Sequence, residues 1–312
     1  RRGMNIFFTT STFASTIRLS APLAFAAMGA CYGHKAKIFN IGLESYVIIS
    51  AFFAAWGSYL FQSAWMGLLF GIIAGIVTSA VFGIFVLHLK ADPIVVGIAM
   101  NLGAYSLTSL LLLNIFHTRG SFSSARMVGF SRWNIPFLNG IPIVNEIFNN
   151  HYSVVYISLL TVVLCHILMY KTPFGLRIRG VGINEKASES VGVSVIKYKW
   201  YSLILTGILT GAAGACLPLC GLSMFVENMS AGKGFLAVSA ARIGMGDPLR
   251  SLIACLIFSY ADALSVSLQS INIPSQIVLL APYLVTVIVM CFTSSQRPVF
   301  SRKKKTEAQI SR

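Results

Sequence analysis

Charged residues, and acidic ones above all, are scarce in this chain. Of its 312 residues, 11% are charged, with 9 Asp and Glu against 24 Lys and Arg, whereas 56% are hydrophobic. The mean hydropathy is +0.76. Because a soluble domain carries about 25% charged residues, this composition excludes an ordinary water-soluble fold. It predicts an all-α polytopic membrane protein.

Motifs for catalysis and metal binding are also absent. Ala231-Gly-Lys-Gly234 lacks the spacing of a phosphate-binding loop. The His residues are scattered, and Cys216 and Cys220, one helical turn apart, have no His or acid near them in sequence, so packing is favoured over a metal site. A membrane-bound transferase is a distant alternative, because each Asp is isolated. We expect no catalytic residue, no metal, no cofactor and no enzymatic activity in this chain itself.

Long apolar runs account for most of the sequence. A span needs about 20 apolar residues, and the pattern predicts about eight or nine membrane-spanning helices. The net charge of +15 lies in the links between the runs, so binding of nucleic acid is not expected. Gly-x-x-x-Gly spacing at 67–75 and 207–211 predicts close helix packing. The runs are 12–31, 41–61, 65–89, 93–116, 153–170, 200–220, 249–268 and 276–292.

One apolar run, 235–245, is too short to cross a bilayer and is flanked by glycines. It predicts a half-helix or a re-entrant element buried in protein. A polar break precedes it at 227–234, and a similar break at 40–44 follows the first span. Two such breaks suggest inverted repeats, which mark substrate paths in many transporters.

Polar residues expected within the membrane are the candidates for a substrate pathway, because they are costly in lipid. For each of them a structural role, such as capping a helix or joining two helices, is the alternative. Arg18 and Asp262 are better explained as structural, and the set contains no acid–base chain for an ion-coupled pump. An external energy source is therefore favoured over the rival class, an ion-coupled secondary transporter. The pathway candidates are Asn40, Glu44, Asn101, Glu227 and Asn228.

The segment 171–199 is strongly basic and lies between two apolar runs. Lys and Arg resist translocation, so this segment is expected on the cytoplasmic side, together with the basic tail 297–312. Asn184 is placed to cap a short helix over 185–191, with Gly192 at its end. By parity the loop 116–151 is external, and its apolar residues predict that it lies on the outer membrane interface. A rigid polar projection into the cytoplasm indicates contact with a cytoplasmic partner.

Several segments, taken in order along the chain, resemble one family. They are 21–23, 37–44, 91–102, 172–185, 232–237 and 260–264, which include Lys37-Ile-Phe-Asn-Ile-Gly-Leu-Glu44 and Thr172-Pro-Phe-Gly-Leu-Arg-Ile-Arg-Gly-Val-Gly-Ile-Asn-Glu185. The family is that of the membrane permease subunits of ABC importers in the branched-chain amino acid/ribose class, nearest the nucleoside (basic membrane protein-dependent) and simple-sugar branch.

This resemblance implies one permease domain, 1–296, in the bacterial cytoplasmic (inner) membrane, with the C-terminus in the cytoplasm. It implies three partners: an ATP-binding subunit that carries ATP and Mg, a second homologous permease subunit and an extracytoplasmic binding protein. The sequence departs from the family pattern at Ser45 and Met245-Gly-Asp247, which leaves riboflavin or a simple sugar open beside a nucleoside. Leu176 and Ile178 are expected to join Phe174 as apolar anchors. The coupling residues expected are Phe174, Arg177, Arg179, Asn184, Glu185, Ala187 and Val191.

Overall fold

The structure, a computed structural model, describes residues 9–134, 142–221 and 223–268. Within these ranges, seven helices are long and apolar enough to cross a membrane. They coincide with the expected runs up to residue 268, so the all-α polytopic fold is confirmed; the run 276–292 and the tail 297–312 lie outside the described residues. The seven are α1 (Thr10–Lys35), α2 (Leu43–Phe61), α3 (Ala64–Gly83, continued by a π-helical turn over Ile84–His88), α4 (Pro93–Phe116), α6 (Ser153–Tyr170), α9 (Val195–Leu219) and α11 (Pro248–Leu268).

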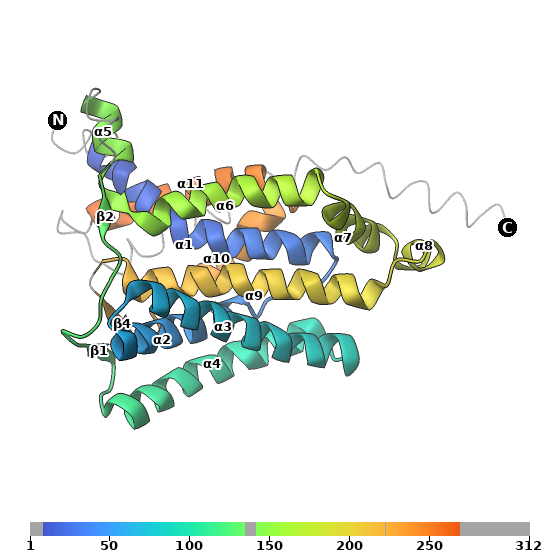
Figure 1. Cartoon of the computed structure of the whole chain (residues 1–312), viewed down its shortest axis with the longest axis horizontal. Helices are drawn as coiled ribbons and strands as arrows, with labels where there is room; N and C mark the ends of the chain where they lie inside the picture. Colours follow the sequence, from blue (N-terminus) through green and yellow to red (C-terminus); the bar gives the residue numbers. More distant parts are fainter. Residues whose placement is uncertain (1–8, 135–141, 222, 269–312) are drawn as a thin grey trace.

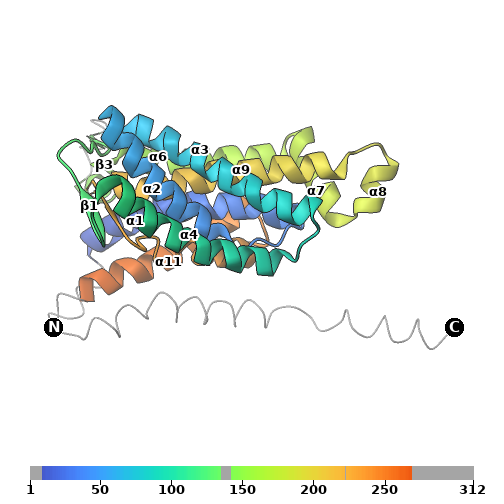
Figure 2. The ribbon, with the colours of Figure 1, turned by 90° about the horizontal axis from the view of Figure 1, so that it is seen from below.

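Shorter elements gather at the two ends of the bundle (Figure 1). One end, here the strand end, holds two small antiparallel pairs, β1 (Ser121–Ser123) with β4 (Met224–Val226) and β2 (Arg132–Trp133) with β3 (His151–Tyr152), together with α5 (Pro142–Phe148). The other, here the α8 end, holds α7 (Pro173–Ile183) and α8 (Glu185–Ser190), which extend beyond the bundle (Figures 1 and 2).

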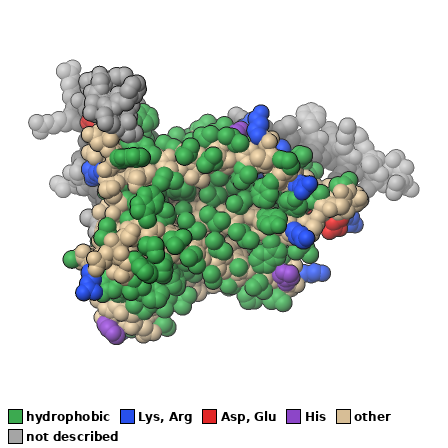
Figure 3. All heavy atoms as spheres, viewed as in Figure 1, with side chains coloured by type: hydrophobic (Ala, Val, Ile, Leu, Met, Phe, Trp, Pro, Cys, Tyr) green, Lys and Arg blue, Asp and Glu red, His purple; other side chains and the backbone are tan. Residues whose placement is uncertain are grey.

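The surface between the two ends is apolar. Large side chains such as Val95, Leu102 and Leu160 are more than half exposed, at 65%, 66% and 58%. Figure 3 shows hydrophobic side chains over the middle of the molecule and Lys and Arg at its ends, most of them near α7 and α8. Such a surface is stable only against lipid or another apolar protein surface, as expected for a membrane-spanning bundle.

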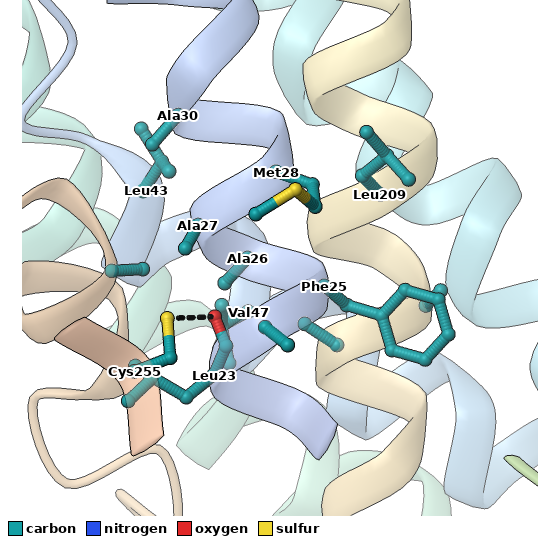
Figure 4. Packing of buried hydrophobic residues seen from close by; sticks show 14 of the residues in the cluster. Leu23, Phe25, Ala26, Ala27, Met28, Ala30, Leu43, Val47, Leu209 and Cys255 are labelled. Atoms are coloured by element: carbon teal, nitrogen blue, oxygen red, sulfur yellow. Dashed lines mark hydrogen bonds between the residues drawn. The ribbon is translucent and has the colours of Figure 1, made fainter. Parts of the chain in front are cut away.

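The core forms around α1 and α9, which run in opposite directions through the centre of the bundle and pack against α2, α3, α10 (Lys233–Ile243) and α11. Figure 4 shows the contact between α1 and its neighbours, where the Cys255 thiol lies 3.7 Å from the carbonyl oxygen of Leu23. Helices α3 and α9 approach closely through glycine: a methyl group at Gly75 would overlap the carbonyl oxygen of Gly207. The packing predicted from the Gly-x-x-x-Gly spacing is therefore confirmed.

Each of the two central helices is followed by a break and a helix that begins inside the bundle. After α1 the chain turns back before α2 starts at Leu43, and after α9 it turns back before α10 starts at Lys233. The first turns of α2 and α10 touch, since a methyl group at Gly234 would lie 2.5 Å from the Glu44 nitrogen. With 11 residues, α10 spans about 16 Å, half of a bilayer core. The short run 235–245 is thus a half-helix, in the opposed arrangement that an inverted repeat produces.

Candidate functional site where two broken helices meet

Two asparagine side chains, one from the break before α2 and one from α4, bond to the backbone at the start of α2. Asn40 accepts a hydrogen bond from the Gly42 nitrogen at 2.7 Å and donates one to the Tyr46 hydroxyl at 3.0 Å. Asn101, on α4, accepts from the Ser45 nitrogen at 2.9 Å and donates to the Ile41 carbonyl at 3.2 Å. The same Ser45 N–H also donates to the Gly42 carbonyl at 3.1 Å. The Asn101 amide is therefore a second acceptor for an N–H in the first turn of α2, where no i−4 carbonyl is available.

Glu44 joins α2 to α10. Its side chain is 0% exposed. One carboxylate oxygen accepts from the Ser230 hydroxyl at 2.6 Å, the Gly232 nitrogen at 2.8 Å and the Tyr105 hydroxyl at 3.1 Å, and the other accepts from the Gly234 nitrogen at 2.7 Å. The carboxylate thus occupies the N-terminus of α10, where the orphan N–H groups and the helix dipole favour negative charge.

The hydrogen bonds of Glu44 indicate a structural role for this residue. Its oxygens accept hydrogen bonds from Tyr105 on α4 and from three donors in the segment 230–234. These four bonds account for a buried acid without invoking a substrate. The structure therefore brings together three of the sequence candidates, Asn40, Glu44 and Asn101, as a connected set of helix caps.

A small cavity of about 30 Å³ adjoins this set towards the α8 end, with Asn40, Leu43 and Thr206 in its wall. That volume holds roughly one water molecule. Next to it the Arg242 guanidinium lies over the Phe39 ring, 4.2 Å from its centre, a favourable contact that covers the cavity on this side.

The other two candidates, Glu227 and Asn228, lie elsewhere. The Glu227 carboxylate accepts from the Gly120 nitrogen at 3.2 Å, and its own nitrogen donates to the Gly120 carbonyl at 2.8 Å, at the edge of the β1–β4 pair. Asn228 is exposed, with φ of 60°. They belong to the strand end, and sequence reasoning missed Ser230 and Tyr105, which contact Glu44 instead.

The 171–199 segment forms a second site. The Thr172 hydroxyl accepts from the Gly175 nitrogen at the start of α7, and the Asn184 side chain accepts from the Ala187 nitrogen at 3.2 Å at the start of α8. The capped helix predicted from Asn184 is present, although it ends at Ser190, with Val191 as its C-cap. An ion pair of 2.9 Å between Glu185 and Lys199 ties α8 to α9.

The face that this segment presents to solvent is partly apolar. Ile183, Val191 and Leu176 are 81%, 75% and 61% exposed, and Asn184, Glu185 and Ala187 are exposed beside them. Ile178, expected as an apolar anchor, is 0% exposed. That expectation is wrong, because α7 is helical and turns this residue into the bundle. Ile183 was missed, and its place between Gly182 and Asn184 gave no signal of exposure.

The remaining coupling candidates bond within the protein. Phe174 is half-buried against the rings of Tyr198 and Tyr201. Arg177 donates to the Tyr198 hydroxyl at 2.7 Å. The Arg179 guanidinium lies 4.8 Å from the centre of the Tyr170 ring. These contacts hold α7 rigidly against α6 and α9.

A third group of contacts links α7 to the inner ends of other helices. Gly182 lies so close to the end of α1 that a methyl group there would overlap the Lys35 carbonyl oxygen. Gly246, after α10, touches the same residue. Burial alone would raise the pKa of Asp247, but hydrogen bonds from the Arg250 and Leu249 nitrogens and the Tyr170 hydroxyl hold that pKa below its usual value. In the described part of the chain, no three metal-ligating side chains lie together.

A bundle of membrane-spanning helices with two broken helices that meet at its centre is the architecture of a membrane transport protein. The chain belongs to the family of branched-chain amino acid transport system permease components, which matches residues 12–291. Its role is therefore that of the non-catalytic transmembrane permease subunit of an ABC transporter, and it is a multi-pass membrane protein.

Individual known proteins support this assignment, because their similarity to the chain covers most of both proteins. The chain is 30% identical to the nucleoside ABC transporter permease protein NupC of Lactococcus lactis, across 92% of this chain and 93% of that protein. It is 30% identical to the guanosine ABC transporter permease protein NupQ of Bacillus subtilis, across 88% and 89%. A metal-chelate type ABC transporter solved in an inward-facing conformation has the same fold, with a TM-score of 0.53, 16% identity and coverage of 89% and 84%.

Proposed function

We propose that this chain is the permease subunit of a nucleoside importer driven by ATP. The observation that carries the proposal is the similarity to NupC and NupQ along nearly the whole chain. The transport path, 1–296, would then receive a nucleoside from an extracytoplasmic binding protein. ATP and Mg would be bound by a separate ATPase subunit, and this chain itself would hold no cofactor.

The ATPase docks on α8 and the residues beside it. Ile183 and Val191 supply apolar contact area on the solvent side of a segment that is otherwise polar, and aliphatic anchors with a polar rim suit a protein interface. The basic character of 171–199 supports a cytoplasmic location for this end, with the C-terminal tail on the same side and 116–151 outside. The membrane is the bacterial cytoplasmic membrane.

A second permease subunit packs against α4. This helix lies at the edge of the bundle (Figure 1) and is the least buried of the seven spans. Its exposed face is not purely apolar, since it carries Ser106 and Asn114. Exposed polar side chains in a span are unfavourable in lipid but suit a helix interface or a solvated path. Tyr105, whose hydroxyl donates to Glu44, connects α4 to the point where the broken helices meet.

Closure of the ATPase moves α8, and the contacts of α7 carry that motion inward. Gly182 lies against the backbone of Lys35 at the end of α1, and Gly246, three residues after the end of α10, lies against the side chains of His34 and Lys35. From there α10 leads back to Glu44. A displacement of the α8 end therefore reaches the junction of the two broken helices. We expect this junction to differ between the inward- and outward-open states.

Transport in proteoliposomes tests the function. The chain, co-expressed with its ATPase and companion permease, should take up labelled guanosine or adenosine in the presence of ATP and a loaded binding protein. Riboflavin and ribose serve as the competing substrates. Uptake by this chain with an ion gradient and no ATPase would instead establish a secondary transporter.

Association with the ATPase tests the docking surface separately. Ile183→Glu and Val191→Glu should insert normally into the membrane but lose co-purification of the ATPase. Leu89→Glu is the matched control, because Leu89 is 64% exposed near the same end of the bundle but directly follows the π-helical turn after α3, outside the 171–199 segment. Equal ATPase recovery from all three variants would exclude α8 as the docking site.

A further inference from the structure

A polar cavity at the strand end is not used by the transport mechanism. It has a volume of about 460 Å³ and lies between α1, α5 and the β2–β3 pair. We call it the arginine pocket, defined by Arg18, Arg132, Asn134, Asn145, Asn149 and His151; Glu146 is the one acidic side chain in its wall.

The side chains of its two arginines are not paired with an acid. Both residues are exposed, and in the part of the chain that the structure describes neither side chain forms an ion pair or a hydrogen bond. Arg132 only lies over the ring of Tyr152, 5.5 Å from its centre. Their positive field acts on His151: burial lowers the pKa of its imidazole, and the charges of Arg18 and Arg132 lower it further. The pocket therefore carries an excess of positive charge.

The rear wall of the pocket is a preformed amide network. Asn149, which is 6% exposed, donates to Asn134 Oδ1 at 2.6 Å and to Asn145 Oδ1 at 2.7 Å. His151 is 2% exposed and held by the Ile147 carbonyl, 2.8 Å from its Nε2. A wall fixed in this way presents polar groups without the cost of ordering them when a ligand binds.

The position of the pocket along the membrane normal indicates which ligand it would bind. Arg18 lies about 26 Å along α1 from Lys35, close to the thickness of the hydrocarbon layer, so it sits at the opposite membrane boundary. Trp133, next to Arg132, and Trp65 at the same end are 63% and 55% exposed, as in the aromatic belts that mark the headgroup level. At this level the abundant anion is the phosphate of a lipid.

We propose that the arginine pocket binds the phosphate of an outer-leaflet lipid headgroup, with Arg18 and Arg132 as its charged donors. Guanidinium groups match phosphate geometry and form charge-assisted hydrogen bonds with it. The asparagine amides would hold the remaining oxygens or the glycerol hydroxyls. The bound lipid would fasten α5 and the loop around it to the start of α1.

Native mass spectrometry and thermal unfolding of the purified full-length chain test this site. Phosphatidylglycerol should bind and raise the unfolding midpoint of the wild type. Arg18→Gln or Arg132→Gln should each weaken binding about tenfold or more, since a hydrogen bond to a charged group contributes roughly that much. Arg126→Gln is the control, because Arg126 is an exposed arginine of the same loop that does not line the pocket.

The same measurements with inorganic phosphate in place of phosphatidylglycerol show whether the pocket binds a lipid headgroup or free phosphate. Protection by inorganic phosphate alone would overturn the lipid assignment, and so would unchanged phosphatidylglycerol binding in the Arg18→Gln/Arg132→Gln double variant. If a glutamine variant does not fold, Arg18→Lys and Arg132→Lys keep the charge but lose the planar fork. These should bind the lipid more weakly than the wild type, and equal binding would also overturn the proposal.

Discussion

Replacement of Glu44 by glutamine tests the centre of the fold with a change of almost no volume. The carboxylate accepts four hydrogen bonds, three on one oxygen and one on the other. A glutamine amide offers one acceptor oxygen. Its best orientation keeps the donors Ser230, Gly232 and Tyr105 and turns its NH2 group towards the Gly234 nitrogen, where two donors then face each other.

The size of the effect follows from these contacts. One hydrogen bond to a charged group is lost, which contributes about 1.5–3 kcal/mol, and a buried N–H is left without a partner. Removal of the negative charge from the start of α10 adds about 1 kcal/mol. We expect Glu44→Gln to lower the free energy of unfolding by about 3–5 kcal/mol. Glu44→Ala, which loses all four contacts, should cost more. Ser230→Ala, which loses one bond to the carboxylate, should cost about 1.5–3 kcal/mol.

Unfolding in mixed detergent micelles gives the free energies, and hydrogen exchange reports the amides at the start of α10. Glu189→Gln, the same change at an exposed site on α8, should alter stability by less than about 0.5 kcal/mol. A Glu44→Gln protein as stable as the wild type, with unchanged protection of the Gly232 and Gly234 amides, would refute the role given to this carboxylate.

Three further changes have outcomes fixed by the structure. Gly75→Ala should destabilise the bundle by several kcal/mol in the same unfolding assay, whereas Gly103→Ala on α4, with no atom within 4 Å of its new methyl group, should not. Because His151 has a pKa below 6.5 in the folded protein, the unfolded chain binds its proton first. Stability should therefore fall as the pH drops through 6.5 towards the folded pKa, and His151→Gln should flatten that part of the thermal-unfolding profile. Gly182→Ala should displace α7 from α1 and lower nucleoside uptake per ATP hydrolysed, while the ATPase still co-purifies.

The membrane spans were predictable because lipid imposes their length and composition. The helix α8 was predictable for a different reason: its cap, Asn184, acts on a nitrogen three residues away, so the whole interaction lies within one short segment. The close packing of α3 and α9 was visible in the glycine spacing, although the sequence does not say which helix faces which.

The partners of Glu44 were not predictable. Ser230 and Tyr105 are polar residues of ordinary types, separated from it by 186 and 61 positions, and only the tertiary fold brings them together. Glu227 and Asn228 were assigned to the pathway as polar residues expected within the membrane. In the structure Glu227, at the start of the break 227–234, bonds to Gly120 beside the β1–β4 pair. Only the later part of the break, from Ser230 onwards, reaches Glu44.

The same distinction explains why Ile178 is buried and Val191 is exposed although both lie within one segment. Val191 follows a short helix that extends beyond the bundle, so its exposure depends on local chain direction alone. Ile178 lies on α7, whose orientation is set by Arg179 on Tyr170 and by Gly182 against α1. Those contacts rotate one face of α7 into the core. In the proposed mechanism these are also the contacts that connect the docking surface to the end of α10. The residues whose burial is hardest to predict are therefore the ones through which motion at α8 would reach Glu44.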